Sequence, residues 1–160
     1  MSRTLVELSD RWDLQDLVTR YATCIDARDF DGLDRVFTPD ARVSYEASGG
    51  PADDYPAVRT WLAEMLPIFA STQHLMGNLA VTLDGDTATG RWYLQDRVIV
   101  PAFDTMIIGS AFYSDTYARQ DGRWVITSTG YKRTYEAMLN LKDIPSFQLT
   151  DNHLAPTGGQ

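Results

Sequence analysis

The hydrophobic pattern of this chain changes its period near His74, and this change limits what the chain can fold into. Before His74, apolar residues recur at helical spacing and form one face, made by Leu14, Leu17, Val18, Tyr21, Ala22 and Ile25. After it, long segments rich in Tyr, Trp, Val, Ile and Thr have the composition of half-buried strands. Helices that precede a long antiparallel meander are typical of an α+β fold, in which the helices lie on one face of a sheet.

The helices and turns can be placed from local signals. Ser9 is the expected N-cap of the first helix. A short second helix is expected to turn Phe30, Leu33, Val36 and Phe37 inward and to stop at Pro39. A strand should follow over 41–47, then a loop over 48–54, and then a third helix with Pro56 in its first turn.

Two hairpins are expected in the second half of the chain. The dipeptides Asp84-Gly85 and Asp121-Gly122 are favoured in tight turns between antiparallel strands. We therefore predict a cone-shaped α+β barrel, in which N-terminal helices cover a curved, mostly antiparallel sheet and enclose a central cavity. The 160 residues suit one domain over 1–140, followed by an irregular tail over 141–160 that we expect to act as a lid or an oligomer contact.

Composition excludes several classes of function. The net charge of −8 argues against nucleic acids and anionic membranes as partners. Cys24 is the only cysteine, so an internal disulfide and a zinc cluster are excluded. The sequence contains two histidines and neither an HExxH motif, a phosphate-binding glycine loop nor a GxSxG elbow, so we expect no metal and no cofactor. Without a signal peptide or a membrane-spanning run, a cytoplasmic protein is the default expectation.

His74 and Asp26 are the candidate catalytic residues. His74 lies in the mostly apolar stretch MLPIFASTQHLMGN, and Asp26 lies at the edge of the apolar face of the first helix. A carboxylate paired with a lone imidazole orients the ring and stabilises the imidazolium that forms when the ring takes a proton. The alternatives are a core histidine and a solvated helix-end aspartate.

Further residues are candidates for contacts with a substrate. Tyr21 lies on the inward helix face, where its phenol could hold a carbonyl or assist a leaving group, or could simply belong to the core. Asn78 could contact a polar group of the substrate or serve a turn. The candidate pocket walls, which could equally be core, are Trp61, Met65, Trp92, Phe112, Tyr113 and Tyr131.

The sequence resembles a known family over most of its length. The segment DRWDLQDLVTRYATCIDARDFDGLDRVFTPDARVSYEASG, with STQHLMGN, LDGDTATGRWYL and YSDTYARQDGRWVI, is similar to SnoaL-like proteins of the nuclear transport factor 2-like superfamily. The resemblance implies that Tyr21, Asp26 and His74 correspond to the catalytic tyrosine, aspartate and histidine of bile-acid 7α-dehydratase. The aspartate and histidine also match the dyad of hexachlorocyclohexane dehydrochlorinase, whose last-strand arginine corresponds by counting to Thr129. Arg133 could replace that arginine only if the strand register allows it.

The resemblance implies an enzyme of small-molecule chemistry. We predict a cofactor-free, dehydratase-like lyase that uses His74 and Asp26 on a hydrophobic cyclic substrate of polyketide or terpenoid type. An isomerase or polyketide cyclase with the same base is the second hypothesis, and a non-catalytic small-molecule-binding module is the third. The resemblance also implies a homo-oligomer, a dimer or a trimer that associates through the outer face of the sheet.

Overall fold

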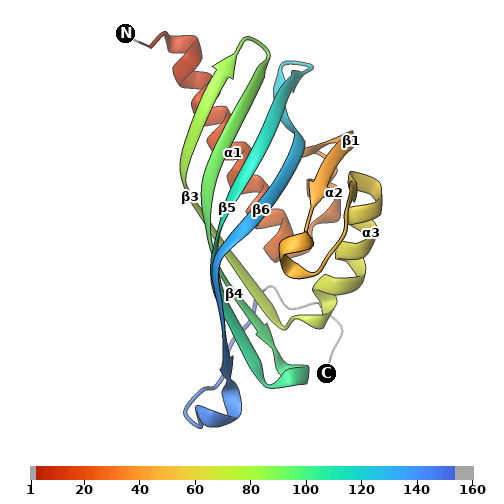
Figure 1. Ribbon diagram of the computed structural model, residues 1–160, viewed down its shortest axis with the longest axis vertical. Helices are drawn as coiled ribbons and strands as arrows, with labels where there is room; N and C mark the ends of the chain where they lie inside the picture. The colour runs from red at the N-terminus through yellow and green to blue at the C-terminus, as the bar shows by residue number, and fades with distance from the viewer. Residues whose placement is uncertain (1–2, 154–160) are drawn as a thin grey trace.

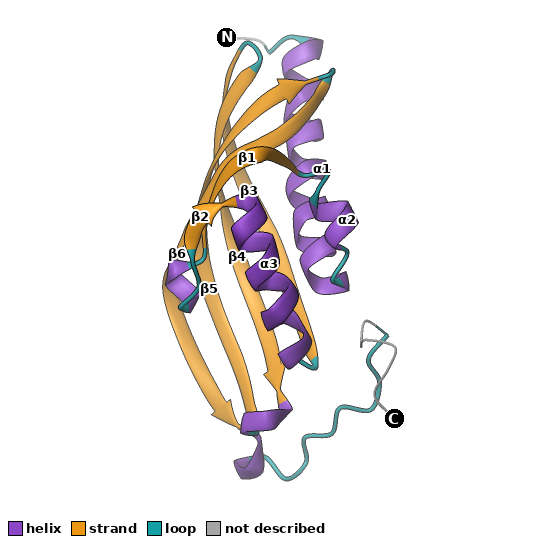
Figure 2. Cartoon of the chain, turned by 90° about the vertical axis from the view of Figure 1, so that its right-hand side faces the viewer, coloured by secondary structure: helices purple, strands orange, loops and turns teal. Residues whose placement is uncertain are grey.

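In the computed structural model, which describes residues 3–153, the helices cover one face of a curved sheet (Figure 1). Figure 2 shows the two layers from the side, with α1, α2 and α3 on the same face of the strands. The helices are α1 (Leu5–Ala27), α2 (Phe30–Leu33) and α3 (Tyr55–Met65), and short 3-10 turns are η1 (Glu46–Ser48), η2 (Leu66–Ile68), η3 (Pro101–Phe103) and η4 (Leu141–Asp143). This arrangement confirms the predicted α+β fold.

The first helix begins five residues earlier than expected. Ser9 lies inside α1, and the N-cap is Thr4, whose hydroxyl accepts a hydrogen bond from the backbone of Glu7 at 3.2 Å. The Glu7 carboxylate accepts one in return from the backbone nitrogen of Thr4 at 2.7 Å. This capping box satisfies the first backbone donors of the helix, so Ser9 is not needed as a cap.

The sheet has six strands in the order β2-β1-β6-β5-β4-β3. The strands are β1 (Phe37–Ser44), β2 (Ala52–Asp54), β3 (Ser71–Asp84), β4 (Thr87–Val100), β5 (Thr105–Gln120) and β6 (Arg123–Asn140). The long strands β3 to β6 pair antiparallel in sequence order, whereas β1 pairs parallel with β6. Positive φ angles at Gly85, Asp121 and Gly122 confirm the two predicted hairpin turns.

The segment around Pro39 differs from the prediction. The second helix ends at Leu33, and Phe37 and Pro39 already belong to β1. The register between β1 and β6 is irregular between Phe37 and Arg42, which is where a residue without a backbone N–H interrupts a ladder. The short strand β2 lies within the segment that was expected to be a loop.

Bulges decide which side chains of β6 face inward. Thr127 and Thr134 have no partner in the register with β5, so the alternation of side chains shifts twice along the strand. The inward side chains are therefore Trp124, Ile126, Thr129, Tyr131, Arg133, Glu136 and Met138. One strand thus contributes both to the core and, after the first bulge, to the cavity.

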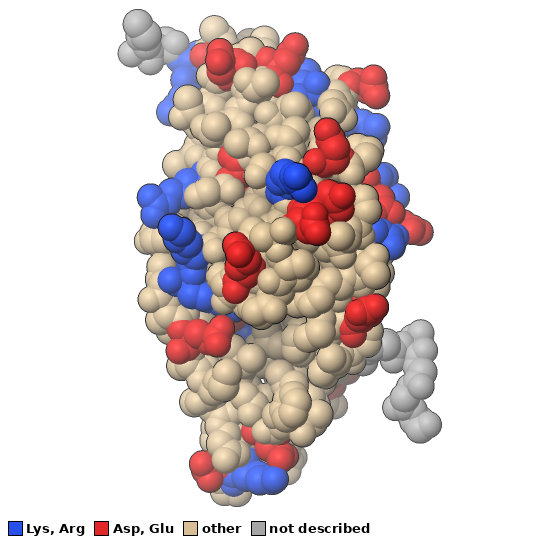
Figure 3. Space-filling model, turned by 45° about the vertical axis from the view of Figure 1, so that its right-hand side comes forward, with Lys and Arg blue, Asp and Glu red and all other residues tan. Residues whose placement is uncertain are grey.

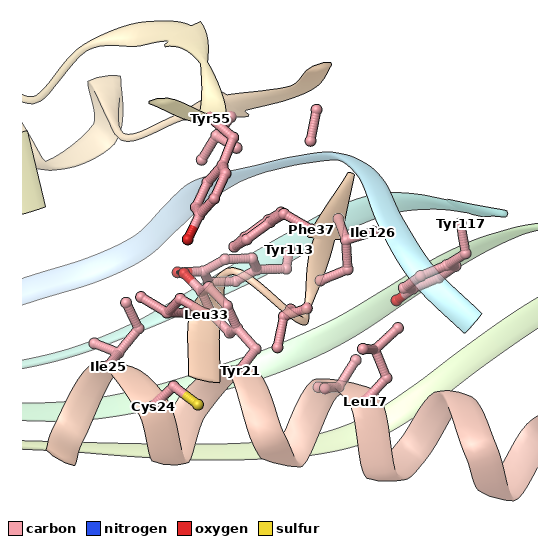
Figure 4. Packing of buried hydrophobic residues seen from close by; sticks show 14 of the residues in the cluster. Leu17, Tyr21, Cys24, Ile25, Leu33, Phe37, Tyr55, Tyr113, Tyr117 and Ile126 are labelled. Carbon is pink, nitrogen blue, oxygen red and sulfur yellow. The ribbon is translucent and has the colours of Figure 1, made fainter. Parts of the chain in front are cut away.

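A hydrophobic core fills the space between α1 and the sheet. Figure 4 shows Leu17, Tyr21 and Ile25 of α1 pointing toward the strands, where Tyr113 and Tyr117 come down to meet them. Within residues 3–153, no helix has both the length and the hydrophobicity that a membrane span requires.

The tail forms the short turn η4 and then runs without helix or strand to His153. The amide of Asn152 donates a hydrogen bond to the carbonyl of Ala70 at 2.5 Å, which brings the tail back to the start of β3. The last part of the predicted tail, 154–160, lies outside the described residues.

Candidate active site

A cavity of about 450 Å³ lies between α3 and the half of the sheet where β3 and β5 begin and β4 and β6 end. Most of its wall is aliphatic or aromatic, with Trp61, Met65, Phe69, Leu94, Tyr113 and Tyr131 as large contributors. Figure 3 shows few charged side chains on the lower half of the surface facing the viewer, apart from those gathered at its tip. A concave apolar site with a few polar groups is the usual form of a small-molecule site.

Asp26 and His74 meet at the wall of this cavity. The Nδ1 atom of His74 lies 2.6 Å from Oδ1 of Asp26, and each side chain is 15% exposed. The same carboxylate accepts the backbone N–H of His74 at 2.9 Å and the hydroxyl of Thr72 at 2.9 Å. His74 and Thr72 both line the cavity, whereas Asp26 lies behind them. Three donors therefore hold the carboxylate, and the carboxylate holds the ring.

The end of α1 and the start of β3 bring the pair together. Asp26 lies in the last turn of α1, and Arg28 caps the helix in the left-handed conformation with φ 55°. The Arg28 guanidinium donates to the carbonyl of Leu66 at 3.2 Å and to that of Phe69 at 2.5 Å, which ties the helix end to η2. Because only two residues separate η2 from β3, these contacts position both members of the pair.

Tyr21 does not reach the cavity. It is 2% exposed, and its hydroxyl lies 2.5 Å from that of Tyr45 and 3.4 Å from that of Tyr113. Tyr45 and Tyr113 both line the cavity, as does Tyr131, so a ligand could touch these phenols and not that of Tyr21. Burial, and then the neighbouring phenols, raise the pKa of Tyr21 well above its usual range, and burial likewise raises the pKa of Tyr113. Burial also raises the pKa of Tyr45, so these three phenols are hydrogen-bonding groups that keep their protons.

Four of the predicted wall residues line the cavity, namely Trp61, Met65, Tyr113 and Tyr131. Trp92 and Thr129 do not, because they turn toward a second buried carboxylate. The indole Nε1 of Trp92 donates to Asp115 at 2.5 Å, and the hydroxyl of Thr129 donates to it at 2.6 Å.

Asn78 and Phe112 lie away from the cavity. Asn78 is exposed and adopts φ 55° beside the bulge that interrupts the register of β3 with β4. Phe112 packs on Tyr93 with ring centroids 4.0 Å apart and under the guanidinium of Arg91, so it belongs to the outer face of the sheet. Its neighbours Ala111 and Tyr113 face inward, as strand alternation requires.

Sequence reasoning missed Asp96 and Glu136, and it made a role for Arg133 depend on the strand register. We call Asp96, Arg133 and Glu136 the charged wall, and all three line the cavity. Nη1 of Arg133 donates to both carboxylate oxygens of Asp96 at 2.7 Å, and its Nε lies 3.3 Å from Glu136. Burial opposes the charge of the guanidinium, but the bonds to Asp96 raise the pKa of Arg133.

The register explains why Asp96 was missed. Asp96 is the partner of His74 across the β3–β4 hairpin, although counting back from the turn would pair His74 with Arg97. The bulge near Asn78 moves the pairing by one residue. Within the described part of the chain, no group of three or more His, Cys, Asp or Glu side chains is placed to hold a metal ion.

Comparison with known proteins gives a family match. A family model described as a SnoaL-like domain matches residues 6–130. An uncharacterised protein of Mycobacterium tuberculosis is 35% identical over 137 residues, which cover 85% of this chain and 93% of that protein. A protein of Mycobacterium bovis, also uncharacterised, matches with the same identity and coverage.

Solved structures share the architecture. A hexachlorocyclohexane dehydrochlorinase, LinA type 2, superposes with a TM-score of 0.75 at 24% identity, covering 83% of this chain and 90% of that one. A putative scytalone dehydratase from Novosphingobium aromaticivorans superposes with a TM-score of 0.75 at 20% identity, covering 82% and 88%. At these identities the likeness concerns the fold.

Proposed function

Because this chain belongs to the SnoaL-like family, within the nuclear transport factor 2-like superfamily, we propose that it is a cofactor-free, dehydratase-like lyase for a hydrophobic cyclic molecule. The observation that carries the proposal is the 2.6 Å contact between His74 Nδ1 and Asp26 Oδ1 at the wall of a mostly apolar cavity. A buried carboxylate bonded to one ring nitrogen orients the imidazole and leaves the other nitrogen to take a proton.

The proposed reaction needs only the residues of this site. Nε2 of His74 removes a proton from the carbon next to a carbonyl, and the electron pair of that C–H bond forms the new double bond. The C–O bond at the β-carbon breaks, and the hydroxyl leaves as water after it receives the proton from the imidazolium. Asp26 stabilises the imidazolium between the two proton transfers.

The tyrosines act as hydrogen-bond donors in this proposal. The role expected of Tyr21, to hold a carbonyl or assist a leaving group, is assigned instead to the tyrosines that line the cavity. Tyr45 and Tyr113 line the cavity, and each lies within 3.4 Å of the Tyr21 hydroxyl. A buried phenol whose pKa is raised is a poor acid, but it can stabilise the oxygen on which negative charge develops. Tyr21 then orients those hydroxyls from behind.

The test uses a bicyclic β-hydroxy ketone, 3-hydroxy-1-tetralone, whose loss of water gives 1-naphthol. We expect the wild-type protein to accelerate this reaction, and His74→Ala to lower the rate by about 10²–10⁴-fold, the usual contribution of a general base. Asp26→Asn should also lower the rate, because the ring loses its orienting acceptor. His153→Ala removes the other histidine, which is exposed, and serves as the matched control.

The outcomes separate the competing functions. Turnover that survives His74→Ala contradicts the assigned base. Deuterium exchange from heavy water into 1-tetralone, without water loss from the hydroxy ketone, would indicate an isomerase or cyclase. Binding of both ketones with neither exchange nor elimination would indicate a non-catalytic binding module.

A further inference from the structure

The cavity has a second polar feature besides the dyad, and it is built across three strands. Asp96 is on β4 and Arg133 on β6, and β5 runs between them. The residue of β5 that pairs with Asp96 is Gly109. A Cβ atom added there would lie 2.8 Å from Nη1 of Arg133 and 2.9 Å from Oδ1 of Asp96. The absence of a side chain at Gly109 therefore makes room for the pair to meet over the middle strand.

The central ion pair of the charged wall is largely buried, although the Nε atom of Arg133 makes no hydrogen bond. The Asp96 side chain is 2% exposed and that of Arg133 is 17% exposed. Besides Asp96 and Glu136, the guanidinium has Ser48 Oγ at 3.5 Å from its Nη2 and the ring of Tyr131 at 5.7 Å from its central carbon. The short hydrogen bonds of the guanidinium therefore go to Asp96, and Nε lies near Glu136 as an ion pair without a hydrogen bond.

The charges of the wall do not cancel. One guanidinium faces two carboxylates, those of Asp96 and Glu136, so the wall carries a net charge of about −1 when all three are ionised. Asp26 adds another negative charge behind His74, the cross-strand partner of Asp96. A ligand carboxylate placed here would meet excess negative charge in a poorly solvated space. A hydroxyl or ammonium could instead donate to the free lone pairs of the two carboxylates.

We propose that the charged wall of Asp96, Arg133 and Glu136 selects ligands that present a neutral or cationic hydrogen-bond donor and rejects ligands that present a carboxylate. The inference rests on the proposed function in one respect, which is that the cavity is the site where the ligand binds. It narrows the substrate to a hydrophobic ring system that carries a hydroxyl or amino group near the reacting carbon, because Asp96 is the cross-strand partner of His74. Arg133 acts as the bridge that holds the two carboxylates together.

The experiment measures equilibrium binding by titration calorimetry of three naphthalene probes. The probes differ in one substituent, which is hydroxymethyl, aminomethyl or carboxylate. Wild-type protein should bind the hydroxymethyl and aminomethyl probes at least about tenfold more tightly than the carboxylate probe. The double variant Asp96→Asn/Glu136→Gln leaves the guanidinium positive, so it should bind the carboxylate probe at least about tenfold more tightly than wild type does.

Two further variants serve as an alternative to the double variant and as a control. Glu136→Gln alone changes a side chain that is 35% exposed, so it tests the same preference if removal of the buried Asp96 charge prevents folding. Glu64→Gln removes an exposed carboxylate of α3 outside the cavity wall and should leave the preference unchanged.

Some results would overturn the inference. Wild-type protein that binds the carboxylate probe as tightly as the other probes, or more tightly, would contradict it. An unchanged preference in both Glu136→Gln and the double variant would also contradict it. So would the absence of binding for all three probes. His74→Ala should retain the preference while losing turnover, so failure of the proposed chemistry and failure of this inference give different results.

Discussion

At the scale of single residues, Asp26 and Asp115 are two carboxylates with different surroundings, the first partly buried and the second buried. Asp26 is bonded to His74 at the cavity wall. Asp115 is 3% exposed and accepts hydrogen bonds from Trp92 Nε1, from the hydroxyl of Tyr117 at 2.8 Å and from that of Thr129. Burial is the largest influence on Asp115, and it raises its pKa to about 6 although the three donors oppose this shift.

Asp115 should therefore give the stability a pH dependence of defined sign. Its pKa is raised in the folded state, so the wild-type protein loses stability as pH rises from the unfolded value of 3.8 to the folded value of about 6. Asp115→Asn removes this loss, and the amide can donate to the hydroxyl of Thr129, which can also accept. The free energy of unfolding of the variant minus that of wild type should rise by ~3 kcal/mol across this range.

Urea unfolding of both proteins at several pH values between about 4 and 7 measures this difference, since titrations common to both proteins cancel. A difference that does not change with pH would show that burial of Asp115 does not favour its protonated form.

At the scale of elements, bulges determine what the strands present to the cavity. A strand of regular alternation that faces inward at Trp124 and Ile126 would turn Tyr131 and Arg133 outward. The unpartnered Thr127 reverses the alternation, and the bulge beside Asn78 does the same for β3. Both the charged wall and the position of His74 opposite Asp96 depend on these irregularities.

Asn78 should act through the backbone of its bulge. Its φ of 55° is readily adopted by glycine, tolerated by asparagine and costly for a β-branched residue. We expect Asn78→Gly to keep or raise the stability, by up to ~1 kcal/mol, and Asn78→Val to lower it by ~1–2 kcal/mol. Urea unfolding measures both changes.

Neither substitution should alter the affinity for the hydroxymethyl naphthalene probe, because Asn78 lies outside the cavity wall. A folded Asn78→Gly protein that no longer binds the probe would restore the role of a substrate contact to this residue.

At the scale of the whole molecule, the outer face of the sheet presents large apolar side chains on the side away from the helices. Leu75 is 62% exposed, Tyr93 41% and Tyr135 50%, and the three line one shallow groove. Such a patch is typical of an interaction surface. We expect a second copy of this chain to cover it, in line with the predicted homo-oligomer.

Leu75→Glu should weaken this association, because it would bury a charge against the apolar side chains of the second copy. Sedimentation velocity should show a shift of the variant toward the monomer. Leu5→Glu adds the same charge at an exposed leucine of α1, which is 85% exposed, and should leave the wild-type assembly unchanged. A monomeric wild-type protein, or equal shifts in both variants, would contradict the expected interface.

Much of the fold follows from local physical chemistry that the sequence displays directly. Helical spacing from Leu14 to Ile25 predicts α1, and the dipeptides Asp84-Gly85 and Asp121-Gly122 predict the hairpins, because turn geometry depends on a few adjacent residues. The expected encounter of Asp26 with His74 followed from the place of Asp26 at the edge of an apolar helix face, from the mostly apolar stretch around His74 and from the family resemblance, and the two side chains are in contact.

The composition of the cavity wall was decided by the tertiary structure. Phe112 and Asn78 face outward, Trp92 and Thr129 turn to Asp115, and Arg133 faces the cavity. One unpaired residue reverses the direction of every side chain beyond it, and no local pattern in this sequence reveals a bulge. The sequence by itself therefore determined the main helices and hairpins and which pair could be catalytic, because these depend on adjacent residues, whereas strand register decided which charges share the cavity with that pair.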